Sequence, residues 1–463
     1  MKKTYFNKIR SILLAGAALI LLTTTSCKKF LTPNPEAGAI QSTDVFTSDG
    51  TATSAILGMY TTMMYGGIGT TAYNGTLGVF LGLASDELND YTQKYLDWQN
   101  DKPINTAYAP DYYIWSTAYN DIYQANIAIE GLPAANGLSD SIRTQLLGEC
   151  YFIRAFSYFL LTNVYGAVPL AVSSNYSVNA TLARADSATV YQQIVSDLHQ
   201  AESLLTATYP SQDMVRANRY VAQALLARVY LYQQNYTAAE AMVDSVLAGP
   251  YQLESNLSGV FQTTSTEVIW ELLPITQGYF NAYDYSWYTP ANSNSGPLKY
   301  LTPSLVSTFE TGDQRAKTWV TAYPFGGTTY YYPSKYTAAP ASAATQYNVV
   351  LRLAEQYLIR AEARAWQGNL SGAASDLNVV RTRAGLGATT AATEPALLTA
   401  IAHERRVELF TEWGHRWFDL KRTGTIDAVI GSLKPTWNDD YRLAPIPQLE
   451  IAADPNLTQN PGY

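Results

Sequence analysis

Three carboxylates lie close together in one short segment and are the first candidates for acid–base chemistry. They are Asp86, Glu87 and Asp90, directly before Tyr91. A glycosidase needs two carboxyl groups on either side of the bond that it cuts, roughly 5–10 Å apart. Acidic residues in a polar segment are more typical of a solvated turn or a helix cap, and next of hydrogen bonding to sugar hydroxyls. We therefore predict no catalytic residue and no enzyme activity, with a surface glycosidase as an alternative.

A second charged group lies near the C-terminal end, where Glu404 and Glu408 are four residues apart. This spacing places both carboxylates on one face of a predicted helix. Planar guanidinium groups pair with carboxylates in a fixed geometry, so we expect Arg416, Asp419 and Arg422 to join them in a network. The favoured interpretation is structural, ahead of ligand contact and catalysis.

Aromatic residues are the main candidates for ligand binding, since the chain contains 36 Tyr, 9 Trp and 13 Phe. A flat ring can pack on the C–H face of a sugar while nearby amides and carboxylates bind the hydroxyls. The residues predicted to do this are Tyr95, Trp98, Asn100, Tyr283, Asp284, Tyr285 and Trp287. Trp98 and Trp287 are the expected stacking platforms, and Tyr330, Tyr331 and Tyr332 form a similar group. A place in the core or facing a protein partner is the alternative for each.

Composition excludes several classes of function. The formal net charge is −8, and it becomes about −12 once four basic residues of the N-terminal segment are removed, which argues against nucleic acid as a partner. Of the two cysteines, Cys150 lies in an apolar run and is predicted to be a core thiol. The three histidines have no metal-ligand spacing, so we predict neither a metal nor a cofactor.

The N-terminal segment has the features of a secretory signal. Basic residues precede an apolar run at residues 12–22, and small polar residues lead to Cys27. A cysteine at this point is typical of a bacterial lipoprotein, in which it carries lipid such as palmitate after cleavage. We predict a signal peptide at residues 1–26, lipidation of Cys27 and a tether at 27–43. A cleaved signal without lipid and a retained anchor helix are the alternatives.

The rest of the chain, residues 44–463, is predicted to form one mainly α-helical unit. Segments at about 111–250 and 348–425 have helical periodicity, and two copies of a helix pair align with an offset of 134 residues. The repeat resembles tetratricopeptide-like pairs, which stack because one pair cannot bury its own apolar face. A loop-rich excursion at about 251–347 separates the copies and contains one predicted strand at 266–273.

Several segments together resemble the SusD/RagB-like family of outer-membrane nutrient-binding lipoproteins. They are residues 26–31, 154–158, 165–170, 224–231, 351–355, 360–363, 378–381, 404–409, 414–422, 445–447 and 456–463. They extend over nearly the whole chain after the signal. The segments at 404–409 and 414–422 are the most specific.

This resemblance implies a fold and a function. The expected fold is an α-α superhelix of tetratricopeptide-like pairs, with an irregular ligand-binding half. The expected function is capture of a glycan at the cell exterior by a lipid-anchored outer-membrane protein, followed by delivery to a TonB-dependent transporter barrel. A peptide ligand is the first alternative, and a plain protein scaffold is another.

Overall fold

The fold is seen in a computed structural model that describes residues 45–65, 71–103, 110–275 and 280–463. The predicted signal peptide, the tether and Cys27 lie outside the described residues. Residues 46–463 form one unit. No helix within the described ranges is long and apolar enough to cross a membrane.

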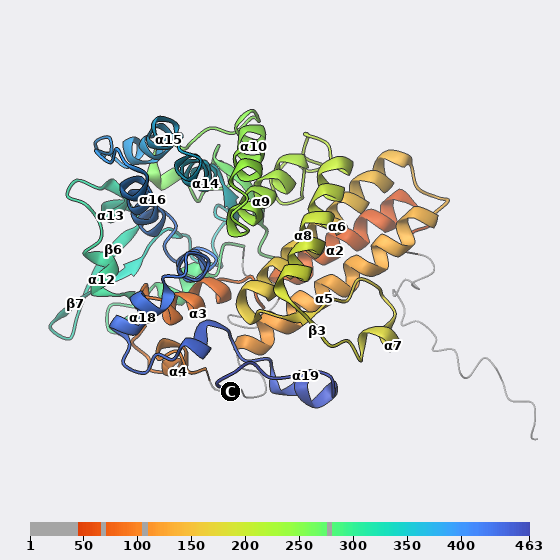
Figure 1. The fold of residues 1–463 in the computed structure, drawn as a ribbon, viewed down its shortest axis with the longest axis horizontal. Helices are drawn as coiled ribbons and strands as arrows, with labels where there is room; N and C mark the ends of the chain where they lie inside the picture. Colours follow the sequence, from red (N-terminus) through yellow and green to blue (C-terminus); the bar gives the residue numbers. More distant parts are fainter. Residues whose placement is uncertain (1–44, 66–70, 104–109, 276–279) are drawn as a thin grey trace, which may run out of the picture. The chain divides into compact units, whose positions relative to one another are not determined.

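Helices form the larger part of this unit, as the sequence predicts (Figure 1). The N-terminal helices are α2 (Asp49–Met64), α3 (Thr76–Ala84), α4 (Leu96–Gln99), α5 (Pro110–Gly131), α6 (Asp140–Tyr165), α7 (Tyr176–Asn179) and α8 (Ser187–Leu204). The repeat helices are α9 (Arg219–Tyr232), α10 (Tyr236–Leu247), α14 (Leu353–Trp366) and α15 (Leu370–Arg383). The C-terminal helices are α16 (Glu394–Glu408), α17 (His415–Arg422), α18 (Ile426–Leu433) and α19 (Gln448–Ala453). The predicted mainly α class is confirmed.

The two copies of the repeat fold in the same way because their turns carry the same cap. Asn235 and Asn369 accept a hydrogen bond from the backbone of the first turn of α10 and α15, respectively. Ala239 and Ala373 are fully buried where the two helices of each pair meet. Small side chains at these points allow the close approach that the sequence repeat predicts.

Buried ion pairs join neighbouring helices of the stack. Arg154 on α6 holds Asp197 on α8 through two bonds of 2.8 and 2.7 Å. Arg228 on α9 holds Glu355 on α14 through two bonds of 2.6 Å. Bidentate pairs of this kind fix the distance and the rotation between two helices.

Four short two-stranded sheets are found in the described residues, and four of their strands lie in the predicted loop-rich excursion. The antiparallel pairs are β1 (Leu88–Asp90) with β5 (Lys299–Leu301), β2 (Val168–Pro169) with β3 (Arg184–Ala185), β4 (Val268–Leu272) with β8 (Asn348–Arg352), and β6 (Val320–Phe325) with β7 (Thr328–Pro333). The predicted strand at 266–273 is confirmed as β4. The β6–β7 hairpin and the short helices α11 (Asp284–Tyr288), α12 (Pro303–Val306) and α13 (Gln314–Thr318) were not predicted.

Glu404 and Glu408 are fully buried at the centre of a network of arginines. Glu408 accepts hydrogen bonds from Arg315 (2.9 Å), Arg352 (2.6 Å) and Arg383. Burial alone would raise the pKa of Glu408, but the charges of these arginines lower it well below its usual value. The structural interpretation agrees with this arrangement.

The predicted partners of these two glutamates are wrong. Asp419 and Arg422 form a separate group, in which Arg422 bonds to Asp419 at 2.7 Å and Asp419 also accepts from Arg405. Arg416 turns to Asp86 instead. The observed partners come from α13, β8 and α15, and helical spacing carries no information on contacts between elements so far apart in the chain.

Asp121 gives a testable pH dependence. It is fully buried on α5, where Tyr73 donates a 2.6 Å hydrogen bond to it, and burial raises its pKa to about 8 against the effect of that bond. A carboxyl whose pKa is raised by folding stabilises the protein at low pH, and this contribution is lost as pH rises toward 8. We therefore expect Asp121→Asn to gain stability relative to the wild type between pH 4 and 9, by at most about 1.4 kcal/mol per pH unit. Urea unfolding of both proteins over this range measures it, and parallel pH profiles would contradict it.

Candidate functional site

The structure brings together two groups of predicted binding residues that lie far apart in the sequence. Tyr95, Trp98 and Trp287 all pack against Phe80 on α3, with ring centroids 4.9, 5.3 and 5.8 Å from it. Lys299 on β5 lies over the rings of Tyr95 and Trp287, at 4.9 and 5.2 Å from their centroids. We call these five residues the aromatic floor.

The two tryptophans of the floor are buried and Tyr95 is half-buried, which corrects the role expected for the tryptophans. Trp98 is 3% exposed and Trp287 is 4% exposed, so neither indole offers a free face to a sugar ring. The indole Nε1 of Trp287 donates to the carbonyl of Asn74 at 3.1 Å. Amphipathic aromatic residues serve equally well in a core, and residue type alone does not separate the two cases.

The other predicted residues of the second group divide between core and surface. Tyr283 is 1% exposed and Asp284 is also buried, where it accepts a 2.8 Å hydrogen bond from Asn348. Burial raises the pKa of Asp284 to about 7. Tyr285 is half-buried. Tyr283 and Asp284 therefore support the surface from beneath, as the two tryptophans do.

Replacing Trp287 separates the structural role from direct binding. We expect Trp287→Ala to lower the free energy of unfolding by about 3–5 kcal/mol, because it leaves a cavity against Phe80 and removes the bond to Asn74. Chemical denaturation followed by circular dichroism measures this. A variant with wild-type stability and weaker ligand binding would restore the stacking role.

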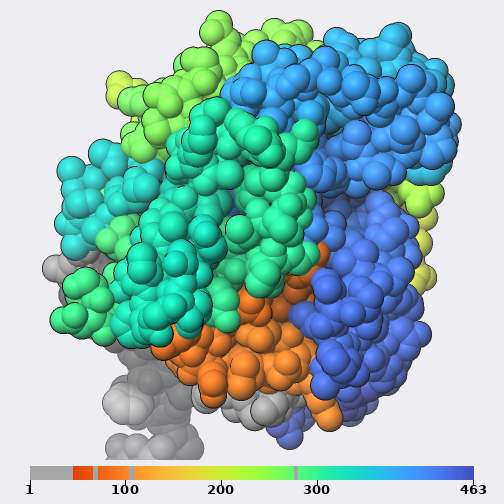
Figure 2. Space-filling view, turned by 90° about the vertical axis from the view of Figure 1, so that its left-hand side faces the viewer, coloured from red at the N-terminus to blue at the C-terminus, as the bar shows by residue number. Residues whose placement is uncertain are grey.

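A polar cleft of about 460 Å³ opens beside the aromatic floor. It is lined by Ser85, Asp86, Leu88, Asn89, Gln99, Asn100, Thr302, Pro303, Ser304, Leu433, Lys434, Pro435 and Thr436. Figure 2 shows this side of the molecule, where the orange N-terminal segment reaches the surface between the teal segment and the blue C-terminal segment. Of the residues predicted to bind ligand, Asn100 lines the cleft.

A partly exposed group of aromatic rings, which we call the aromatic platform, continues the same surface. It consists of Tyr91, Tyr300, Phe325 and Tyr330, each half-buried or exposed. The Tyr330 ring lies 5.5 Å from Tyr91 and 5.0 Å from Tyr300, and Tyr91 lies 6.2 Å from Phe325. Rings gathered in this way keep an apolar face at the surface beside hydroxyls that can bind water or a ligand.

The short β1–β5 ribbon joins the cleft to the platform. Asn89 stands opposite Tyr300 in its register, so both side chains lie on the same face of the ribbon. Leu88 and Asp90, the neighbours of Asn89 on β1, are buried. Asn89 lines the cleft and Tyr300 belongs to the platform, and the two surfaces are therefore continuous.

Asp90 positions Tyr91, the exposed tyrosine that directly follows β1. Its carboxylate accepts hydrogen bonds from the backbone of Thr92 at 3.0 Å and of Tyr95 at 2.7 Å, and it lies 3.5 Å from Lys299. These contacts close the turn that carries Tyr91. Asp90 therefore lies at a turn, but it is 5% exposed, so the expectation of a solvated turn is wrong for it as well.

The sequence reasoning missed Tyr91, Tyr300 and Phe325 as platform residues. The sequence offered no clear signal, because Leu88, Asn89, Asp90 and Tyr91 run apolar, polar, polar and aromatic and lack the period of two that marks a half-buried strand. The run is too short to predict a strand by itself. Its partner, β5, lies roughly two hundred residues later in the chain, and nothing in the sequence pairs them.

Asp86 and Glu87 do not form the acid–base pair of a glycosidase in this arrangement. Asp86 is bound by Arg406 at 2.6 Å and by Arg416 at 2.7 Å, and these arginines lower its pKa against the effect of burial. The expectation of a solvated turn is wrong for Asp86, which is 4% exposed. Glu87 is also buried and accepts from the backbone of Thr411, and burial raises its pKa to about 7.

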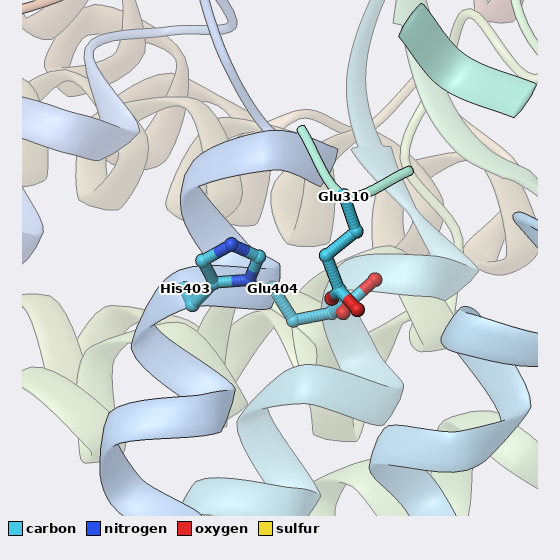
Figure 3. Close-up of side chains that lie close together, drawn as sticks. All are labelled: Glu310, His403 and Glu404. Carbon is cyan, nitrogen blue, oxygen red and sulfur yellow. The ribbon is translucent and has the colours of Figure 1, made fainter. Parts of the chain in front are cut away.

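One group in the described part of the chain has the composition of a metal site. Glu310, His403 and Glu404 place ligand atoms within 4.8 Å of one another (Figure 3). Arg381 binds both carboxylates, at 2.6 and 3.3 Å, and Arg315 also binds Glu404. The carboxylates are thus neutralised by arginine, and the residues do not fit a cation site.

Two family models match separate parts of the chain. One, SusD-like and described as "Starch-binding associating with outer membrane", matches residues 46–231, and the second, described as "SusD family", matches residues 314–463. The chain belongs to the SusD/RagB-like family. The first match ends within α9, and the second covers α14, α15 and the segments at 404–409 and 414–422.

Individual relatives agree with this assignment. SusD-like protein P38 of Formosa agariphila is 27% identical over 431 residues, which cover 78% of this chain and 82% of the relative. SusD-like protein P25 of the same organism is 24% identical over 539 residues, covering 98% and 100%. A SusD superfamily protein of Bacteroides vulgatus has the same fold, with a TM-score of 0.79 at 22% identity over 90% of this chain and 100% of that one. A solved structure described as a laminarin-binding SusD-like protein has a TM-score of 0.75 at 26% identity, with the same coverage.

Proposed function

We propose that this SusD/RagB-like protein binds a glycan at the cleft and the aromatic platform without changing it chemically. The single observation that carries the proposal is the continuity of a polar cleft with a group of partly exposed rings. A sugar ring has an apolar C–H face and a rim of hydroxyls, and this surface offers a counterpart to each.

The polar groups of the cleft suit hydroxyls because they both donate and accept. The side-chain amides of Asn89 and Asn100 line the cleft, and they make no hydrogen bond with another described side chain or backbone group. An amide has two donor hydrogens and an acceptor oxygen, which matches a hydroxyl that also does both. The similarity to a laminarin-binding SusD-like protein makes a β-glucan the first ligand to test.

A panel titration tests the proposal. The purified protein is titrated calorimetrically with laminarin oligosaccharides, other glycans and a set of peptides. We expect a glycan to bind with a dissociation constant between mM and μM, about −4 to −8 kcal/mol, because the surface is shallow and has few free polar groups. Binding of peptides alone would favour the alternative ligand, and a ligand recovered in cleaved form would contradict the proposal.

We further propose that lipid on Cys27 anchors the protein in the outer membrane, facing the exterior, where it delivers its ligand to a TonB-dependent transporter. The motivating feature is the signal-like segment that ends at Cys27. We expect Cys27→Ser to abolish incorporation of labelled palmitate and to release the protein from membranes. Labelling of the variant at the wild-type level would contradict this.

Affinity purification from wild-type membranes tests the partner, and the absence of a transporter from the eluate would count against delivery.

A further inference from the structure

A second cavity, of about 320 Å³, is lined by residues of α5, of α19 and of the segment that includes α7. It is lined by Trp115, Tyr119, Ile122, Tyr123, Asn126, Pro169, Ala171, Tyr176, Asn179, Ala180, Glu450, Ala453, Asp454 and Leu457. It shares no residue with the cleft or the platform. We call it the α5–α19 pocket.

Aromatic rings form much of the wall of the α5–α19 pocket. Trp115 and Tyr119 pack against each other with centroids 4.8 Å apart. Tyr123 and Tyr176 are 47% and 79% exposed, which is unusual for rings that border a pocket. The negative face of an aromatic ring attracts cations, and tryptophan and tyrosine do so most strongly.

The hydrogen-bond donors of this wall are already used within the protein. The Asn126 amide donates to the carbonyls of Ala171 at 2.9 Å and Ser173 at 3.1 Å. The Tyr119 hydroxyl donates to the carbonyl of Pro169 at 2.8 Å, and the Trp115 indole is bonded to Glu450. Donors with good partners have little to gain from a ligand.

The unused polar groups are acceptors, apart from the exposed hydroxyls of Tyr123 and Tyr176. The Oδ1 atom of Asn179 is buried and has no partner among the described residues. Glu450 and Asp454 add two carboxylates to the lining, and Asp454 Oδ1 already accepts a 2.9 Å hydrogen bond from the backbone of Asn456. Burial raises the pKa of Glu450 against the effect of its bond to Trp115. A partly buried carboxylate without a counter-charge gains strongly from a nearby cation.

No lysine, arginine or histidine is among the described residues that line this pocket. Arg154 bonds to the Asn126 side chain, but its remaining nitrogens are held by Asp197. Arg184 donates to the carbonyls of Ala167 and Thr458 and to Asn460. Neither arginine thus neutralises Glu450 or Asp454 through an ion pair in this structure.

We propose that the α5–α19 pocket binds the ammonium or guanidinium group of a small organic molecule, such as a free amine or an amino sugar. Both groups only donate hydrogen bonds and carry a positive charge, so they match acceptors, carboxylates and ring faces together. A neutral sugar is a poorer match because its hydroxyl oxygens also need donors. The proposal does not depend on glycan binding at the cleft.

Titration with matched charged and neutral compounds tests the proposal. The probes are cadaverine and agmatine as free cations, glucosamine as an amino sugar, and 1-pentanol and N-acetylglucosamine as neutral controls, each followed by calorimetry and by tryptophan fluorescence. We expect at least one cation to bind at least tenfold more tightly than its neutral control. Tighter binding of glucosamine than of cadaverine would identify an amino sugar as the ligand class. Tighter binding of cadaverine would identify a free amine. Equal binding of the neutral compounds, or no binding by any cation, would overturn the proposal.

Two substitutions locate the binding. We expect Glu450→Gln to weaken the best cation at least fivefold and Tyr176→Ala to weaken it about threefold. Tyr176 is highly exposed, so its replacement keeps the test valid if the Glu450 variant does not fold. Tyr65→Ala, which removes an exposed tyrosine that belongs neither to this pocket nor to the cleft and platform, is the matched control and should leave cation binding unchanged. Unchanged affinity in both pocket variants, or an equal loss in the control, would overturn the assignment to this pocket.

Discussion

Replacing Glu408 by glutamine is expected to destabilise the protein strongly, by as much as replacing Trp287 by alanine. Glu408 is fully buried and accepts from Arg315, Arg352 and Arg383. Glutamine keeps the shape but removes the negative charge, which leaves buried guanidinium groups without their counter-charge. Breaking a buried pair in this way costs about 3–5 kcal/mol. Urea denaturation of Glu408→Gln measures the difference.

An exposed ion pair provides the control for this prediction. Asp140 pairs with Arg143 at 2.5 Å, and its side chain is 95% exposed. Water and salt screen such a pair, so we expect Asp140→Asn to leave the unfolding midpoint nearly unchanged. Equal effects of the two substitutions would show that the buried network does not hold these elements together.

The second large effect is expected in binding, at the platform. We expect Tyr91→Ala to weaken glycan affinity about tenfold or more, because central aromatic residues carry most of the energy of such a surface. Tyr91 is exposed and contacts Tyr330 and Phe325, so its loss should leave the fold intact. Titration with the best glycan measures the effect, with thermal unfolding as a check of folding.

Two further variants make this prediction sharper. A Cβ atom at Gly296 would lie 2.3 Å from the Tyr91 ring, so Gly296→Ala should displace the ring and weaken binding while keeping Tyr91. Tyr176→Ala removes an exposed tyrosine elsewhere and should leave glycan affinity unchanged. Equal affinity of Tyr91→Ala and wild type would remove the platform from the binding site.

Local periodicity predicted the helix pairs and the mainly α class, because helix pairs are specified by residues that are close in the sequence. The caps at Asn235 and Asn369 and the small residues at Ala239 and Ala373 are all visible within one repeat. The mainly α class and the helix pairs are confirmed by the structure. The β6–β7 hairpin was missed because Tyr and Thr, although typical of strands, were interpreted as part of a loop-rich segment.

The candidate site was predicted only in part, because it depends on contacts between distant segments. The sequence drew attention to residues near 95–100, and of the predicted binding residues Asn100 lines the cleft. It could not show that Trp98 and Trp287 pack against Phe80 in the interior. Nor could it show that Tyr300 lies opposite Asn89 on a paired strand. A tryptophan in a core and a tryptophan in a sugar site have the same residue type, and only the fold separates them.

Hydrogen–deuterium exchange with and without the best glycan tests the central claim most directly. We predict slower exchange, upon binding, in the segments at 85–100, 299–304, 320–332 and 433–436, which carry the cleft and the platform. The segments at 171–180 and 448–457, around the α5–α19 pocket, should exchange at unchanged rates. Slower exchange at 171–180 and 448–457, with no change in the segments of the cleft and the platform, would contradict the account.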